Sequence, residues 1–158
     1  MKTASIRIKY APALVAGLVV LALSFAATAS DAASRERKGR LHLVKDTSQY
    51  SGLPGGFATI TTSDLAEIPV GSKIYYDQAP DIPTGLIDSS VILDAGNGNR
   101  SVGRCTTDLV TWIGLCTFSD GIGTMAGFHA RLDVSLKSLE LGTFDLRGTY
   151  GFTRDGDK

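Results

Sequence analysis

The chain has 158 residues, with 16 Lys and Arg against 16 Asp and Glu, so its formal net charge at pH 7 is zero. Nothing in this balance suggests a nucleic-acid partner, because such a partner needs a clustered basic face. A chain of this length is enough for one domain with a single hydrophobic core.

The N-terminal segment has the pattern of a cleavable export signal. Three basic residues lie within the first nine positions, residues 14–25 are uncharged and mostly apolar, and Ala27-Thr28-Ala29 supplies small residues at the spacing that signal peptidase accepts. An uncleaved membrane anchor is the alternative, but a spanning helix needs about 20 strongly apolar residues, and Ala, Gly, Ser and Thr dilute this run. We therefore expect a signal peptide over residues 1–29, no stable membrane insertion after cleavage, and a secreted protein, either extracellular or periplasmic.

A short basic segment follows the predicted cleavage site. Cleavage removes three of the 16 basic residues and no acidic ones, which leaves 13 basic against 16 acidic residues. The remaining basic run, residues 35–40, favours a solvated, disordered leader over residues 30–40, with a membrane-surface contact or a second processing site as alternatives. The folded domain is predicted over residues 41–158.

From Leu41 onward, short apolar or alternating runs are separated by turns rich in Gly, Pro, Asn and Asp. This rhythm predicts an all-β domain, a single antiparallel up-and-down barrel of about eight strands, because closure hides the sheet edges. A two-sheet sandwich is the alternative. The expected strands are Leu41–Lys45, Phe57–Thr61, Ser72–Asp77, Leu86–Leu93, Ser101–Leu109, Trp112–Ser119, Gly123–Ser135 and Thr143–Phe152.

The last two expected strands alternate most clearly between apolar and polar residues. Period two puts alternate residues on opposite faces, so one set of each strand should face the core. In the final strand, Asp145 and Arg147 should face outward, since a register slip by one residue would bury both charges. The inward set is then Phe144, Leu146, Tyr150 and Phe152, opposite Ala126, Phe128, Ala130, Leu132 and Val134.

The chain has two cysteines, Cys105 and Cys116. A turn centred on Val110-Thr111 would place them directly opposite one another in a hairpin, and an exported protein would oxidise them to a disulfide. A metal site is the alternative, but two cysteines eleven residues apart without a nearby histidine make a poor zinc site. We therefore expect a disulfide and no metal.

The segment from Cys116 to Phe128, followed by Gly148-Thr149-Tyr150-Gly151-Phe152, resembles the glycine-punctuated hairpin of the allene oxide cyclase and dirigent barrel superfamily. The family's usual Gly-Thr-Gly is Gly121-Ile122-Gly123 here, and the similarity covers about the last third of the chain. The resemblance implies an eight-stranded barrel with an apolar lumen, often trimeric, that binds or steers a small hydrophobic molecule. It transfers no catalytic residue to a position in this chain.

Signals for catalysis are sparse. The chain has two histidines, His42 and His129, which limits general-base mechanisms. Ser119, His129 and Asp133 would form a Ser-His-Asp group on paper, but a nucleophile elbow is missing, and alternating charges on a strand are typical of a solvated surface. We favour a role other than catalysis and expect no cofactor.

The sequence therefore predicts a small barrel that binds or guides a small hydrophobic molecule in its lumen. Small alanine side chains beside aromatic ones would leave volume for such a guest, although the same aromatic residues would also fill an ordinary core. A noncatalytic structural or interaction protein of the periplasm or cell surface is the first alternative, and an allene oxide cyclase-like isomerase or cyclase without metal or nucleotide is the second. A homo-oligomer is compatible with each reading. The expected ligand-lining residues are Ala126, Phe128, Ala130, Leu132, Phe144 and Tyr150.

Overall fold

The computed structural model describes residues 37–153. The predicted signal peptide (residues 1–29) and the first part of the predicted leader (residues 30–36) lie outside the described residues. Among residues 37–153, no helix is long and apolar enough to cross a membrane.

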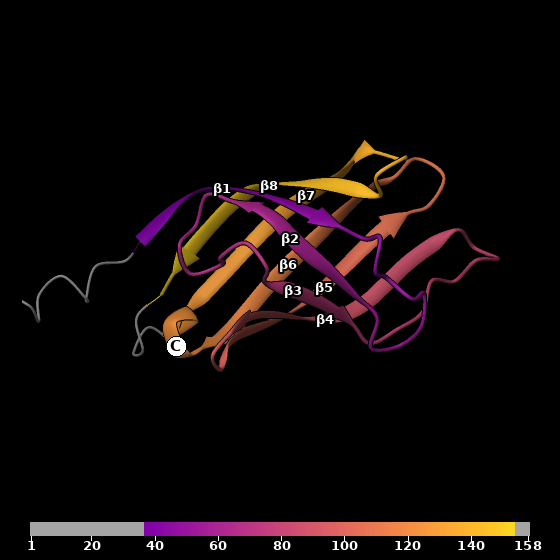
Figure 1. Cartoon of the computed structure of the whole chain (residues 1–158). Helices are drawn as coiled ribbons and strands as arrows, with labels where there is room; N and C mark the ends of the chain where they lie inside the picture. The colour runs from indigo at the N-terminus through magenta and orange to yellow at the C-terminus, as the bar shows by residue number, and fades with distance from the viewer. Residues whose placement is uncertain (1–36, 154–158) are drawn as a thin grey trace, which may run out of the picture. The chain divides into compact units, whose positions relative to one another are not determined.

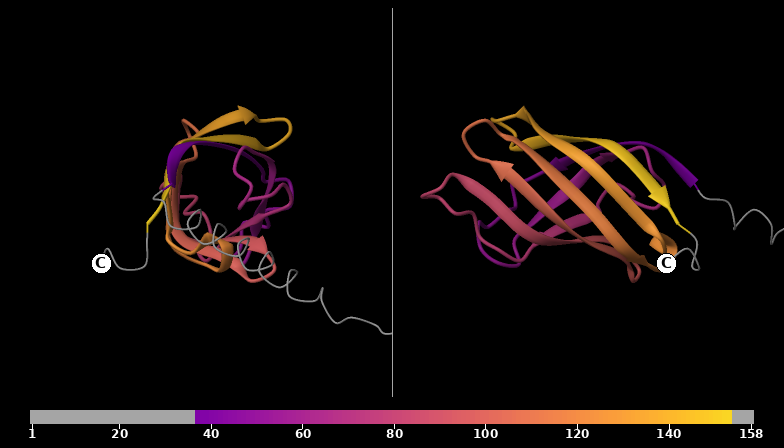
Figure 2. Two further views of the ribbon diagram at one scale, coloured as in Figure 1. Left: turned by 90° about the vertical axis from the view of Figure 1, so that its left-hand side faces the viewer. Right: turned by 180° about the vertical axis from the view of Figure 1, so that it is seen from behind.

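The described chain forms a closed antiparallel barrel of eight strands, in which each strand pairs with the next and β8 pairs with β1. Figures 1 and 2 show this closure, and the end-on view of Figure 2 shows the strands as a ring. The predicted barrel is thus confirmed, and the sandwich alternative is wrong. The strands are β1 (Arg37–Asp46), β2 (Phe57–Ser63), β3 (Lys73–Tyr76), β4 (Leu86–Gly96), β5 (Asn99–Asp108), β6 (Ile113–Ile122), β7 (Phe128–Ser138) and β8 (Thr143–Phe152), with a 3-10 helix η2 (Gly123–Met125) before β7.

Two strands begin four or more residues from their predicted starts. Strand β1 begins at Arg37 and not at Leu41, because residues 37–40 pair with residues 149–152 of β8 and help to close the barrel. This part of the predicted disordered leader is therefore a strand. Strand β7 begins at Phe128 and not at Gly123, because η2 intervenes and Gly123 and Gly127 adopt φ values of 69° and 74°, outside the extended region.

The inward face of the barrel follows the expected alternation. Leu132 and Val134 of β7 are buried between exposed neighbours, and Phe144 and Leu146 of β8 are buried while Arg147 is exposed. The predicted facing of the final strand is confirmed, with Tyr150 and Phe152 half-buried at its C-terminal end. Cys105 and Cys116 are register partners on β5 and β6, form the predicted disulfide with their Cα atoms 4.1 Å apart, and are completely buried.

Glycine at two inward positions permits the strong coiling that a small barrel requires. A Cβ atom at Gly103 would collide with the backbone carbonyl of Thr117 on β6, and one at Gly148 would collide with the carbonyl of Arg131 on β7. Strands approach one another this closely only where a side chain is absent, so these glycines act as bends in the wall.

The barrel has two ends, which differ in the loops that border them. One end, here called the Lys45 end, is bordered by the loops at residues 47–56, 77–85, 109–112 and 139–142, on the right-hand side of Figure 1. The other end, the Arg37 end, is bordered by residues 64–72, the turn at residues 97–98 and the segment from Gly123 to Gly127.

Candidate functional site

A lysine points into the barrel near the C-terminal end of β1. Lys45 continues the inward series of Leu41 and Leu43, and the residue is only 4% exposed. The register between β1 and β2 shifts between Val44 and Lys45, which leaves both of these consecutive residues buried. Such irregularities commonly redirect side chains next to functional sites.

The Lys45 ammonium has few polar contacts. Its Nζ atom donates a hydrogen bond of 2.7 Å to the hydroxyl of Tyr76 and lies 5.4 Å from the ring centroids of Tyr76 and Phe144. Within residues 37–153 it makes no ion pair. A buried ammonium without an anion is costly, and an ammonium can donate three hydrogen bonds, so further acceptors would be stabilising here.

Tyr50 brings another donor to the same place. It lies on the loop between β1 and β2, and its ring centroid is 5.1 Å from that of Tyr76. Its hydroxyl oxygen is the one buried side-chain polar atom in the described part of the chain that has no hydrogen-bond partner. Burial raises the pKa of Tyr50 above its ordinary value, and repulsion from Tyr76 raises it further, so the hydroxyl keeps its proton. Lys45, Tyr50 and Tyr76 are called the Lys45 cluster below.

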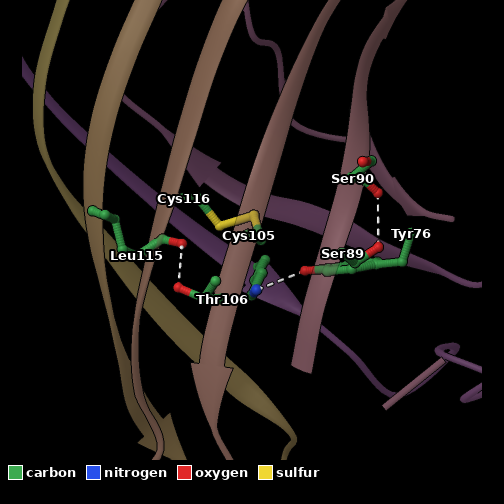
Figure 3. The surroundings of a disulfide bond; sticks show 8 residues. Tyr76, Ser89, Ser90, Cys105, Thr106, Leu115 and Cys116 are labelled. Carbon is green, nitrogen blue, oxygen red and sulfur yellow. Dashed lines mark hydrogen bonds between the residues drawn. A yellow bond between two sulfur atoms is a disulfide. The ribbon is translucent and has the colours of Figure 1, made fainter. Parts of the chain in front are cut away.

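The surroundings of the Lys45 cluster are mostly apolar. Figure 3 shows the inward-facing disulfide of Cys105 and Cys116 together with Ser89 of β4 and the side chain of Tyr76. Trp112 packs beside Phe144 with ring centroids 6.0 Å apart. The backbone of Trp112 has φ of 59°, a left-handed conformation that is an outlier for a bulky residue, and such strain often accompanies a functional position.

Exposed aliphatic side chains surround the Lys45 end. Every one of its four loops carries at least one, between 63% and 82% exposed: Leu53, Ile82, Val110, Leu139 and Leu141. At the Arg37 end, the exposed large aliphatic residue of the described loops is Val70. Exposed apolar groups commonly mark contact with a ligand or partner, and in the described loops they gather at the Lys45 end.

The predicted lining residues are divided between the two ends. Phe128, Ala130 and Leu132 face inward on β7, and Tyr150 is the register partner of Ala130 on β8. Towards the Arg37 end the aromatic rings pack against one another, with Phe152 lying 5.4 Å from Phe128 and 6.0 Å from Tyr150 between centroids. These side chains contribute to the core.

Two of the predicted residues stand apart from this group. Ala126 is exposed and precedes β7, so its assignment to the inward series is wrong; the backbone leaves η2 at Ala126 and turns at Gly127 before the strand starts. Phe144 lies at the opposite end of the barrel and contacts the Lys45 ammonium.

Sequence reasoning missed the Lys45 cluster. The alternation Leu41-His42-Leu43-Val44-Lys45 already placed Lys45 on the inward face, but a charged residue at the end of a strand is usually solvated. The alternation was therefore the available signal for Lys45. Tyr50 had no comparable signal, because it lies on a loop.

The contacts that Ser119 and His129 make in the structure do not link them into the Ser-His-Asp group that the sequence allowed. The Ser119 hydroxyl donates to the carboxylate of Asp120, and His129 Nδ1 lies 3.3 Å from the carbonyl oxygen of Gly127. Neither contact orients a nucleophile towards a base, so the described residues give no support to hydrolysis of this type.

Comparisons of the chain with protein-family models, curated proteins and solved structures give no significant match.

Proposed function

We propose that this protein is a binding barrel that takes up, at its Lys45 end, a small apolar molecule carrying a carboxylate group. The observation that carries the proposal is the Lys45 cluster: a buried ammonium without an anion beside a buried Tyr50 hydroxyl without an acceptor. A carboxylate would supply what both groups lack.

The chemistry of a carboxylate fits these donors. Its two oxygens can accept about four hydrogen bonds, and hydrogen bonds between ionised groups are shorter and stronger than neutral ones. The Lys45 ammonium would donate one of its remaining protons and Tyr50 would donate another, while Tyr76 keeps Lys45 in position. The negative charge of the ligand would offset the cost of burying the lysine.

The apolar part of the ligand would contact the rings and the loops of this end. Phe144 and Trp112 supply aromatic surface beside the Lys45 cluster, and the aliphatic side chains of the four loops extend that surface outward. Tyr50 reaches the ring of Tyr76 from the loop at residues 47–56, so we expect this loop to move when the ligand enters. Loops are the elements that most readily make such movements.

Two further proposals concern the localisation of the protein and the superfamily to which it is related. A disulfide persists mainly in oxidising compartments, which supports export through the N-terminal signal predicted from the sequence. We retain the relation to the allene oxide cyclase and dirigent barrel superfamily as a proposal that rests on the segments around β6, β7 and β8.

The test is a binding comparison between decanoate and decanol, at concentrations below those at which either aggregates. Trp112 is the only tryptophan of the chain and lies beside Phe144, so its fluorescence reports occupancy of the Lys45 end. Lys45→Met keeps the length of the side chain and removes the charge. Lys73→Met is the matched control, because Lys73 also lies over an aromatic ring, 4.2 Å from the centroid of Phe57, but on the outward face of β3.

We expect the wild-type protein and the Lys73 variant to prefer decanoate by about tenfold or more, the size of one charged hydrogen bond. Lys45→Met should bind both compounds with similar affinity, and its retained binding of decanol would show that it is folded. Equal affinities of the wild-type protein for the two compounds, or no response of Trp112 to either, would contradict the proposal.

A further inference from the structure

Positively charged side chains flank β8 on the outside of the barrel. The registers align Arg40 of β1, Thr149 of β8 and Arg131 of β7 in one row across three strands. The next row towards the Arg37 end consists of Lys38, Gly151 and His129. The outer residues are two arginines in the first row and a lysine and a histidine in the second, and the middle residues are the smaller Thr149 and Gly151.

These two rows form a groove of about 520 Å³ on the wall of the barrel. Its outward-facing side chains are exposed, and Gly39, Ala130 and Tyr150, which alternate with them, complete the lining. The ring of His129 lies over Gly151, where a Cβ atom would be 2.5 Å from Nε2 of the histidine. This outer groove is defined by Lys38, Arg40, His129, Arg131 and Thr149.

The two arginines of the outer groove have no counter-ion among residues 37–153. Elsewhere on the barrel an arginine on a strand is paired: the guanidinium of Arg104 donates two hydrogen bonds, of 2.7 and 2.5 Å, to the carboxylate of Asp88. Strand spacing puts Arg40 and Arg131 about 10 Å apart at their backbones, within mutual reach of their long side chains. An anion seated between them would relieve their repulsion.

We propose that the outer groove binds a phosphate group. A guanidinium presents a planar pair of donors that matches two phosphate oxygens, and arginines on both sides of the groove would bind opposite faces of the group. The Thr149 hydroxyl lies in the row between the two arginines as a further donor. The ligand is a phosphate monoester or diester, whether a free compound or the headgroup of a phospholipid.

The first arm of the test is a titration with inorganic phosphate. The backbone amide NMR signals of Arg40, Arg131 and Thr149 report the binding. Chloride at matched ionic strength controls for screening. The test variant is Arg40→Gln combined with Arg131→Gln, and the control is Arg100→Gln, an exposed arginine of β5 that makes no ion pair with a described residue. We expect saturable shifts in the wild-type protein, at least tenfold weaker binding in the double variant and a change below twofold in the control.

The second arm identifies the source of the phosphate group. Wild-type protein is sedimented with vesicles of phosphatidylglycerol or of phosphatidylcholine at the same salt concentration. Sedimentation with phosphatidylglycerol alone, lost in the double variant, assigns the outer groove to an anionic lipid headgroup. Phosphate binding without sedimentation assigns it to a free phosphate compound.

Two results would overturn the proposal. One is the absence of any saturable shift with phosphate beyond that seen with chloride. The other is an equal loss of binding in the double variant and in Arg100→Gln, which would show a response to net charge without a site. Both results are independent of the Lys45 cluster, which faces into the barrel.

Discussion

Asp145 shows how a single outward side chain of β8 is tied to its neighbours. It accepts a hydrogen bond of 2.6 Å involving Nε2 of His42 on β1, and Arg147 lies 3.3 Å away on the same face. The hydrogen bond with His42 lowers the pKa of Asp145 below its ordinary value, burial opposes this effect, and the charges of Arg147, Lys137 and His42 add to it. The ionised carboxylate therefore stabilises the folded state.

This shift predicts a pH dependence of stability. Because the folded pKa is depressed, the contribution of Asp145 is fully present above the ordinary value of 3.8 and is lost as the pH falls through the lower folded value. Asp145→Asn should be less stable than wild type at about pH 5, and this difference should shrink towards about pH 2. Urea unfolding of both proteins across this pH range measures the difference in their unfolding free energies. A difference that stays constant with pH would show that Asp145 acts by packing alone.

The neighbouring residues Leu146 and Arg147 test the facing of β8. Leu146 is completely buried and Arg147 is exposed. Leu146→Ala should cost about 2 to 5 kcal/mol of unfolding free energy, whereas Arg147→Ala should cost about 0.5 kcal/mol or less. Urea midpoints at one pH compare the two variants. Similar losses would mean that the register of β8 is wrong.

At the scale of elements, the sequence predicted all eight strands because each is a short alternating run between turn residues. The prediction failed where tertiary pairing overrides local pattern. Residues 37–40 look like a solvated basic segment, yet their backbones pair with β8, and Ala126 continues an apolar alternation that Gly127 interrupts. Neither the partner strand nor the backbone angle of a glycine can be read from local periodicity.

The hairpin of β5 and β6 offers a test at this scale. The disulfide closes it across one pair of register partners, so its removal frees only a short loop in the unfolded chain. In the chain-entropy model this costs about 3 kcal/mol. A variant with Cys105→Ala and Cys116→Ala should lose stability of this order in urea unfolding and retain its barrel circular dichroism. An unchanged midpoint would contradict this account of the bond.

Strand β7 provides a second test, which asks how tightly the core is packed towards the Arg37 end. Ala130 is 7% exposed and is the register partner of both Phe118 and Tyr150, two aromatic residues that occupy the space beside it. Ala130→Leu should therefore overpack the core and cost about 1 to 3 kcal/mol. Should this variant unfold at the wild-type midpoint, the Arg37 end would contain unfilled volume and would compete with the Lys45 end as a ligand site.

At the scale of the whole molecule, both proposed sites combine residues of separate elements, and the outer groove exists because β8 pairs with β1 to close the barrel. The Lys45 cluster combines residues of β1, β3 and a loop, and the outer groove combines β1, β7 and β8. Arg40 and Arg131 are distant in the sequence, so no run of basic residues indicated a basic face around them. The registers of β8 with β1 and with β7 bring them together. The sequence could predict the barrel but not that a lysine is buried near one of its ends.

The most direct test of the ligand proposal is a map of amide NMR shifts upon addition of decanoate to the wild-type protein. The account predicts saturable shifts at Lys45, Tyr50 and Tyr76 and at the indole of Trp112, with the signals of Arg40 and Thr149 unchanged. These two groups of signals report separately on the Lys45 end and on the outer groove. Shifts confined to Arg40 and Thr149, or no saturable shift at the Lys45 end, would contradict it.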